Sequence, residues 1–177
     1  MTGHGAAAAA SLPAGYALRP MQPGDLTEVH ALEMQLFPAD AWPREMFDAE
    51  LAHPTRQYWV ATRERTIVGY AGLMCIPPVA DVQTIAVAAG HEGHGLGSAL
   101  LRTLHHAAVL SGGREILLEV RAENSRAQAL YRRFGYEHIH TRPRYYADGH
   151  DALIMRCELV AGRTRRSADG RSIHDHR

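Results

Sequence analysis

Two features in the middle of the chain have residue types and spacings that could do chemistry. The first is the glycine-rich stretch GHGLGS at residues 93–98, which follows an apolar strand-like run and precedes a long amphipathic pattern. Alternating glycines let backbone N–H groups approach an anion without interference from a Cβ atom. The N-terminus of the following helix adds free N–H groups and a positive dipole end. The stretch therefore predicts a pyrophosphate site, with a tight turn that binds no ligand as the alternative.

The second feature is Glu119, the charged residue in the apolar run at residues 116–120. An unpaired carboxylate is costly in such a strand and therefore needs a reason. Burial would make it a stronger base, able to take a proton directly or through a water molecule. The alternative is an ion pair with an arginine, for which Arg121 and Arg126 are candidates.

Composition excludes several other kinds of site. All 19 basic residues are arginine, which rules out a Walker A lysine and a Schiff-base lysine. Cys75 and Cys157 lie too far apart for a CxxC motif, and the 12 histidines show no metal-binding spacing, so no metal is expected. The 19 acidic residues balance the arginines, so no direct contact with nucleic acid is expected.

The chain is predicted to hold one domain at residues 16–160. An Ala- and Gly-rich tail at residues 1–15 and an Arg-rich tail at residues 161–177 are expected to be disordered. No apolar run approaches the ~18–20 residues that span a bilayer. We therefore expect a cytoplasmic protein without a membrane partner, and no feature predicts its oligomeric state.

Hydrophobic periodicity predicts the elements that must position the two features. Helical patterns with one apolar face begin at Leu26 and after Trp42-Pro43, and the second should turn Met46, Phe47 and Leu51 inward. A short extended run at 16–20 starts the domain. The further elements expected are a strand hairpin at 57–63 and 67–76, a strand at 81–87, a helix at 96–110, a strand at 116–120 buried on both faces, a helix at 124–135, and strands at 136–140 and 151–159. The helix at 96–110 should face inward with Leu96, Leu100, Leu101, Leu104, Ala107 and Ala108. This order predicts an α/β protein whose mixed sheet is covered by helices.

A Rossmann dinucleotide site is another hypothesis for the glycine-rich stretch, but its context is missing. That fold places the glycine turn after the first strand of the domain and an acidic residue at the end of the next strand. Here the turn lies halfway along the chain and follows antiparallel hairpins. In addition, Glu115 begins a strand instead of ending one.

Four segments follow one another as in the GNAT family of N-acetyltransferases, which the chain resembles. They are residues 84–87, the glycine-rich stretch, LEVRAEN at residues 118–124 and ALYRRFGY at residues 129–136. Phe37-Pro38 with Trp42, and Arg144-Tyr145-Tyr146, are also similar. The resemblance covers about residues 17–159 and implies the GNAT acyl-CoA N-acyltransferase fold, with a mostly antiparallel sheet. It is closest to members that acetylate the N-terminal amine of ribosomal protein S18.

The resemblance implies that acetyl-CoA is the acetyl donor. In similar enzymes, one strand pairs its backbone with the pantetheine arm, the glycine-rich turn holds the pyrophosphate, and an asparagine contacts the cofactor. The implied cofactor-binding residues here are Ile85, Ala86, Val87, Gly93, His94, Gly95, Leu96, Gly97, Ser98 and Asn124. Asn124 also suits a helix N-cap, and the two roles are compatible.

The resemblance also implies that Glu119 is the general base and that Tyr131 protonates the departing thiolate. For Tyr131 the alternative is a packing role in the core. The implied reaction is direct transfer, with a backbone N–H near Val87 stabilising the oxyanion. An α-amine has a pKa near ~8, so a modest base suffices. Cys75 and Cys157 are expected to fill the core, not to carry an acetyl group.

Four aromatic residues are candidates for a groove that accepts an extended peptide N-terminus, with packing as the alternative. They are Phe37, Trp42, Tyr145 and Tyr146. Two other functions stay open, namely an acetyltransferase for a small amine such as a polyamine or aminoglycoside, and a non-catalytic acyl-CoA-binding module. The candidate substrate loops hold no acidic cluster of the kind a polycation calls for.

Glu92 departs from the family pattern. Similar proteins usually carry Arg or Gln at this position before the pyrophosphate turn. Because a carboxylate facing the ligand would repel phosphate, we expect Glu92 to point to solvent. Backbone groups, helped by His94, would then hold the phosphates.

Overall fold

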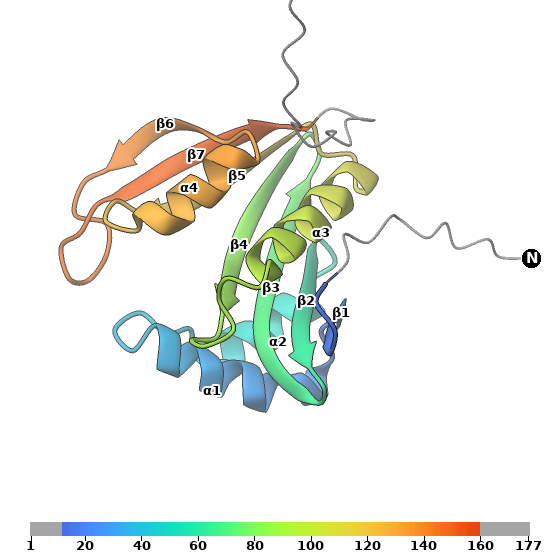
Figure 1. The fold of residues 1–177 in the computed structure, drawn as a ribbon. Helices are drawn as coiled ribbons and strands as arrows, with labels where there is room; N and C mark the ends of the chain where they lie inside the picture. Colours follow the sequence, from blue (N-terminus) through green and yellow to red (C-terminus); the bar gives the residue numbers. More distant parts are fainter. Residues whose placement is uncertain (1–11, 160–177) are drawn as a thin grey trace, which may run out of the picture.

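The computed structural model describes residues 12–159, which form a seven-stranded sheet with helices on both faces (Figure 1). The elements in chain order are β1 (Tyr16–Pro20), the 3-10 helix η1 (Pro23–Asp25), α1 (Leu26–Leu36), α2 (Arg44–Ala52), β2 (Arg56–Arg63), β3 (Thr66–Ile76), β4 (Val79–Val87), α3 (Leu96–Leu110), β5 (Glu115–Arg121), α4 (Ser125–Arg133), β6 (Glu137–Arg142) and β7 (Ala152–Glu158). Apart from η1 this is the predicted order, and the fold class is confirmed. Of the expected tails, only residues 12–15 and none of residues 161–177 are described. Leu12 packs, partly buried, against the core.

The strand order is β1-β2-β3-β4-β5-β7-β6, and every neighbouring pair is antiparallel except β4 and β5. The parallel pairing of β4 with β5 covers only Val79 to Asp81 opposite Glu115 to Leu117. Beyond these residues the two strands diverge, as Figure 1 shows. The sheet is therefore open between the C-terminal ends of β4 and β5, which are the ends that carry the candidate site residues.

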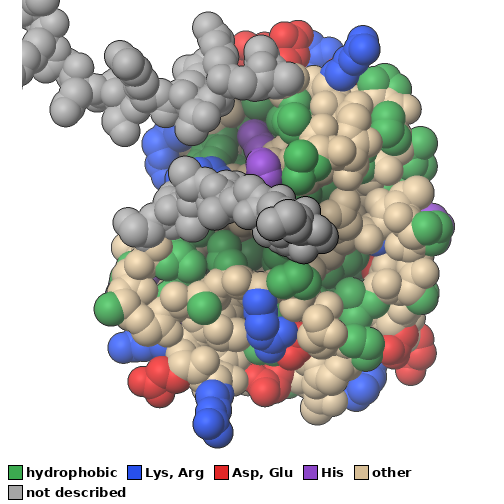
Figure 2. Space-filling view, turned by 90° about the vertical axis from the view of Figure 1, so that its right-hand side faces the viewer, with side chains coloured by type: hydrophobic (Ala, Val, Ile, Leu, Met, Phe, Trp, Pro, Cys, Tyr) green, Lys and Arg blue, Asp and Glu red, His purple; other side chains and the backbone are tan. Residues whose placement is uncertain are grey.

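Two hydrophobic cores lie on opposite faces of the sheet. Helices α3 and α4 cover one face, and the α3 residues predicted to face inward are all buried there: Leu96, Leu100, Leu101, Leu104, Ala107 and Ala108. Helices α1 and α2 cover the other face over Tyr58, Val60 and Tyr70. Cys75 and Cys157 are both buried in the core, as expected. On the β1 side of the molecule, acidic and arginine side chains are interspersed among apolar ones (Figure 2).

Two expectations about burial were wrong. Met46 is 42% exposed, because α2 turns only Phe47 and the partly buried Leu51 toward the sheet. The strand β5 is buried on one face only: Ile116, Leu118 and Val120 are buried, whereas Glu119 is exposed. The reason is the position of the helices on that face, since α1 packs on β3 and α2 on β2.

His105 should make the protein sensitive to acid. Its Nε2 lies 2.8 Å from the Tyr136 hydroxyl, and burial lowers its pKa to about 4. The unfolded chain, with a pKa near ~6.5, takes up the proton first as pH falls. The free energy of unfolding that neutral His105 contributes is thus complete above about pH 6.5. It is lost progressively as pH falls from there, and the loss is complete once pH has fallen through about 4.

We therefore expect this residue to remove about 2 kcal/mol of unfolding free energy between pH 7 and pH 5. The variant His105→Gln, which cannot titrate, should lose correspondingly less over the same interval. Urea unfolding of both proteins at the two pH values measures the difference. Equal losses in the two proteins would show that His105 does not carry the effect.

Candidate active site

The divergence leaves a free backbone edge on β4. The Ala88 N–H donates to the Val68 carbonyl at 2.8 Å, and Ala86 has the same orientation toward β3. Because the bonding direction alternates along an antiparallel pair, Ile85 and Val87 direct their N–H and C=O groups toward β5. In the described residues β5 does not pair with this part of β4. Ile85 and Val87 can therefore pair with an extended ligand, whereas the backbone of Ala86 is already used by β3.

The glycine-rich loop requires glycine for its backbone conformation. Gly93 and Gly95 have φ values of 77° and 79°, and a Cβ added to either would meet nothing within 4 Å. The left-handed conformation, not crowding, thus selects glycine. Gly95 is the N-cap of α3, so the N–H groups of Leu96, Gly97 and Ser98 precede the first helical hydrogen bond, which Ala99 donates to Gly95. These groups fit the predicted anion site.

Two histidine side chains of the glycine-rich loop make polar contacts, one within the loop and one with β1. The Nδ1 of His94 lies 3.0 Å from the Glu92 carbonyl oxygen, so His94 contacts its own loop. The Nδ1 of His91 lies 2.9 Å from the Tyr16 hydroxyl on β1. Glu92 is exposed, as expected, but it does not simply point to solvent: it forms an ion pair with Arg126 of α4 at 3.0 Å.

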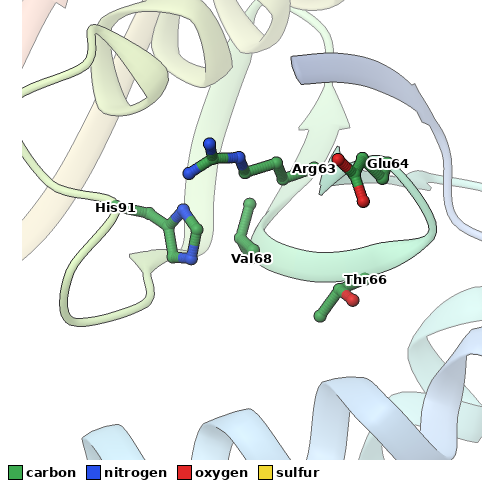
Figure 3. Close-up of a pocket in the computed structure, with 5 residues that line it drawn as sticks. All are labelled: Arg63, Glu64, Thr66, Val68 and His91. Carbon is green, nitrogen blue, oxygen red and sulfur yellow. The ribbon is translucent and has the colours of Figure 1, made fainter. Parts of the chain in front are cut away.

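An open pocket of about 350 Å³ lies on the β2–β3 side of this loop. Its lining residues are Arg63, Glu64, Thr66, Val68 and His91, and the Arg63 guanidinium points toward His91 (Figure 3). The same guanidinium stacks over the Tyr16 ring, 5.4 Å from its centre. The predicted pantetheine path runs on the opposite side of the loop, between β4 and β5, so this pocket is a separate feature.

The start of α4 is fixed by side-chain caps. Asn124 is the N-cap, and its Oδ1 accepts a hydrogen bond from the Ala127 N–H at 3.0 Å. The Gln128 amide donates to the carbonyls of Arg121 and Ala122, which closes the turn between β5 and α4. The N-cap interpretation of Asn124 is confirmed, and its contact with the cofactor stays a prediction.

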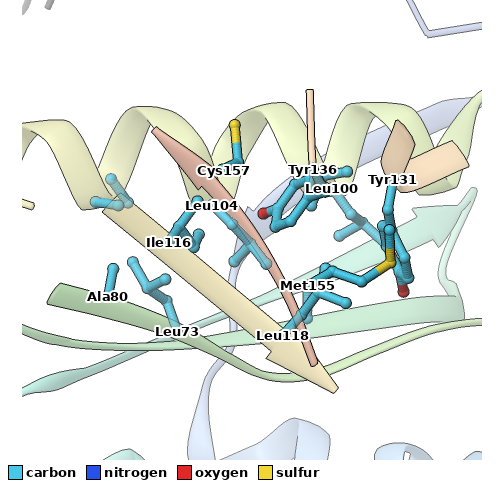
Figure 4. Packing of buried hydrophobic residues seen from close by; sticks show 14 of the residues in the cluster. Leu73, Ala80, Leu100, Leu104, Ile116, Leu118, Tyr131, Tyr136, Met155 and Cys157 are labelled. Carbon is cyan, nitrogen blue, oxygen red and sulfur yellow. The ribbon is translucent and has the colours of Figure 1, made fainter. Parts of the chain in front are cut away.

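Tyr131 lies in the core between α4 and the sheet, beside Tyr136 and Met155 (Figure 4). Its side chain is 6% exposed, and its ring centre is 5.8 Å from that of Tyr136. Burial raises the pKa of Tyr131 to about 12, and the nearby Tyr146 adds to the rise. The phenol therefore keeps its proton at neutral pH, which a general acid requires.

Glu119 is ion-paired and partly exposed, so the expected burial in an apolar strand was wrong. The Arg142 guanidinium of β6 donates to Oε1 at 2.8 Å, and 33% of the Glu119 side chain is exposed. Neither Arg121 nor Arg126 is the partner. Because β7 lies between β5 and β6 in the sheet, Arg142 must reach across one strand.

The β6–β7 loop also contacts Glu119. A hydrogen bond with this carboxylate is the main reason that the pKa of Tyr145 is raised. The rings of Tyr145 and Tyr146 pack edge to face with centres 5.2 Å apart. The two tyrosines predicted to line a substrate groove thus lie beside the candidate base.

Arg121, which the sequence did not single out as a site residue, links the two loops that border Glu119. Its guanidinium pairs with Asp40 in the α1–α2 loop and, at 2.7 Å, with Asp148 in the β6–β7 loop. It also contacts Glu123 at 3.2 Å and stacks over the Tyr146 ring, 4.0 Å from the centre. Both loops that carry the predicted aromatic residues are therefore fixed to the end of β5.

The four aromatic residues differ in exposure. Phe37 and Tyr145 are 37% and 48% exposed, so both can contact a ligand. Trp42 packs on Phe47 with ring centres 5.4 Å apart, which favours the packing alternative for this residue. Tyr146 is half-buried beneath Arg121.

One group of residues in the described part of the chain has metal-like spacing. Glu123, Asp148 and His150 place one ligand atom each within 4.8 Å of one another, and all three are exposed. Both carboxylates already pair with Arg121, so the cluster has a structural explanation. No helix within residues 12–159 is long and apolar enough to span a membrane.

The diverging strands β4 and β5 and the glycine loop before α3 fit the fold that the resemblance to the GNAT acetyltransferases implies. A sequence model of the Acetyltransferase (GNAT) family matches residues 26–136. The chain therefore belongs to this family and is an N-acetyltransferase. GNAT acetyltransferases take their acetyl group from acetyl-CoA.

Individual relatives refine the comparison. The N-alpha-acetyltransferase RimI of Mycobacterium tuberculosis is 41% identical over 148 residues, which cover 77% of this chain and 92% of that protein. An uncharacterized protein of Mycobacterium leprae is 44% identical over 144 residues, or 78% of this chain, but the chain spans only 39% of its length. The crystal structure of the ribosomal-protein-S18-alanine N-acetyltransferase from Escherichia coli superposes with a TM-score of 0.74, at 28% identity, over 85% of this chain and 99% of that one.

Proposed function

We propose that this protein transfers the acetyl group of acetyl-CoA to the N-terminal α-amine of a protein, with ribosomal protein S18 as its substrate. The observation that carries the proposal is the position of Glu119 beside the β6–β7 loop: the Arg142 guanidinium that donates to Glu119 at 2.8 Å also lies over the Tyr145 ring, 5.5 Å from its centre. In this proposal Glu119 is the base, and the exposed ring of Tyr145 beside it is a surface on which a peptide can lie. The similarity to the mycobacterial RimI and to the S18 acetyltransferase of Escherichia coli supports this acceptor.

The proposed chemistry divides among the residues at the divergence. The N–H groups at the start of α3 bind the pyrophosphate, and the free edge of β4 at Ile85 and Val87 pairs with the pantetheine arm. The backbone near Val87 stabilises the oxyanion. Glu119 takes a proton from the attacking amine, directly or through water, and Tyr131 gives one to the departing sulfur.

The charges near Glu119 do not exclude a polycationic acceptor. Asp40, Asp148 and Glu123 all pair with Arg121. Glu119 itself pairs with Arg142. Four carboxylates thus share two arginines, which leaves a net charge of −2 among these six residues. The local charge therefore does not discriminate against a polyamine or an aminoglycoside. The cytoplasmic location expected from the sequence is part of the same proposal.

A panel of acceptors tests the proposal. Acetyl-CoA is supplied with a peptide carrying the S18 N-terminus, with the same peptide blocked at its α-amine but containing a lysine, and with spermidine. Mass spectrometry should detect acetylation of the free α-amine alone. Transfer to lysine or to spermidine would contradict the acceptor, and acetyl-CoA binding without any transfer would favour the non-catalytic module.

Arg121 gives a prediction specific to the acceptor side. The variant Arg121→Ala should raise KM for the S18 peptide about tenfold or more, because the two loops lose their common anchor. The dissociation constant of acetyl-CoA should stay within twofold. Arg156→Ala is the matched control, since Arg156 is also a strand arginine with ion pairs, to Glu115 and Glu158. Steady-state kinetics and calorimetric titration measure the two effects, and equal losses of both affinities would contradict the assignment.

A further inference from the structure

The ion pair between Glu92 and Arg126 spans the two sides of the β4–β5 divergence. Glu92 lies in the loop that follows β4, and Arg126 lies in the first turn of α4, which follows β5. The Nη1 of Arg126 is 3.0 Å from the Oε2 of Glu92, and their side chains are 68% and 51% exposed. The pair therefore sits, open to solvent, between the loop and the helix that border the cofactor path.

The loop supplies no arginine or lysine of its own. Residues 88–98 contain one carboxylate, Glu92, and two histidines. One of these, His94, already directs its Nδ1 at the Glu92 carbonyl oxygen. A diphosphate at the start of α3 would therefore meet backbone N–H groups and a nearby carboxylate. Within residues 12–159, the arginine that pairs with this carboxylate is Arg126 of α4.

The stability of α4 does not explain why an arginine stands at position 126. A cation in the first turn opposes the helix dipole. An ion pair as exposed as this one contributes little to stability. The guanidinium can thus leave the Glu92 carboxylate for a phosphate group at a small cost in free energy. Its planar set of N–H donors matches the geometry of phosphate oxygens.

We propose that Arg126 is a phosphate-binding residue of this enzyme, which leaves Glu92 when acetyl-CoA binds and donates to a phosphate group. This inference rests on the proposed use of acetyl-CoA. In this proposal α4 supplies the cation that the glycine loop lacks. In the free protein Glu92 holds the guanidinium at the site.

A double-mutant cycle tests this inference by calorimetric titration of acetyl-CoA into wild type, Arg126→Ala, Glu92→Gln and the double variant. We expect Arg126→Ala to weaken binding about tenfold in both backgrounds. Glu92→Gln alone should bind at least as tightly as wild type. Arg133→Ala, at the exposed C-terminal end of the same helix, should stay within twofold. S-acetyl-pantetheine, which lacks every phosphate, should bind equally to wild type and Arg126→Ala.

Other results would overturn the inference. If Arg126→Ala weakens binding only when Glu92 is present, Arg126 merely masks the carboxylate. If Arg63→Ala weakens binding and Arg126→Ala does not, the phosphates lie on the opposite side of the loop, near His91. If wild type binds acetyl-CoA and Arg126→Ala binds it equally tightly, this inference alone is overturned. Failure of wild type to bind acetyl-CoA would overturn the proposed function as well.

Discussion

Glu119→Gln is expected to lower kcat for acetylation of an S18 N-terminal peptide by about 10²–10⁴-fold, the usual contribution of a general base. The amide has nearly the shape of the carboxylate but cannot accept the amine proton. The dissociation constant of acetyl-CoA should change less than twofold, because Glu119 lies on the side of β5 that faces Arg142 and Tyr145.

The matched control for this variant is Glu115→Gln. Glu115 lies in the same strand and pairs with Arg156 at 3.3 Å, much as Glu119 pairs with Arg142. If loss of a strand ion pair were the cause, both variants would lose activity. Rapid-mixing kinetics with mass-spectrometric detection would separate the two cases, and a normal kcat for Glu119→Gln would remove Glu119 as the base.

The second large effect is expected for Tyr131→Phe, which should lower kcat about 10²-fold or more through loss of the general acid. The phenol, with a pKa of about 12, is protonated at neutral pH and can donate to the sulfur of the departing thiolate. Phenylalanine keeps the packing against Tyr136, so the free energy of unfolding should change little.

The leaving group distinguishes catalysis by Tyr131 from packing. An acetyl thioester of a more acidic thiol needs less help from an acid, so the deficit of Tyr131→Phe should shrink with such a donor. Tyr136→Phe serves as the control, because Tyr136 belongs to the same cluster but its hydroxyl faces His105. A deficit that does not depend on the donor would indicate that Tyr131 only shapes the core.

Patterns local in the sequence were sufficient to predict the helices and strands. The inward face of α3 and the N-cap at Asn124 both depend on residues close in sequence. Helical periodicity and backbone conformational preference act over such distances. These features therefore agree with the structure.

Partners distant in sequence could not be predicted in the same way. The exposure of Glu119 depends on which half of the sheet α1 and α2 cover, and its partner Arg142 lies two strands away in the sheet. Arg121 contacts Asp40, 81 residues earlier, and Asp148, 27 residues later. Both loops are brought to β5 by tertiary packing, so their contacts leave no periodic signal in the sequence.

The most direct test is to locate the transferred acetyl group on purified ribosomal protein S18. The protein, acetyl-CoA and unmodified S18 are mixed, and fragmentation mass spectrometry identifies the modified nitrogen. We expect one acetyl group, on the α-amine of the first residue, with Glu119→Gln producing almost none in the same time. An acetyl group on a side chain, or S18 left unmodified by a protein that binds acetyl-CoA, would contradict the proposed function.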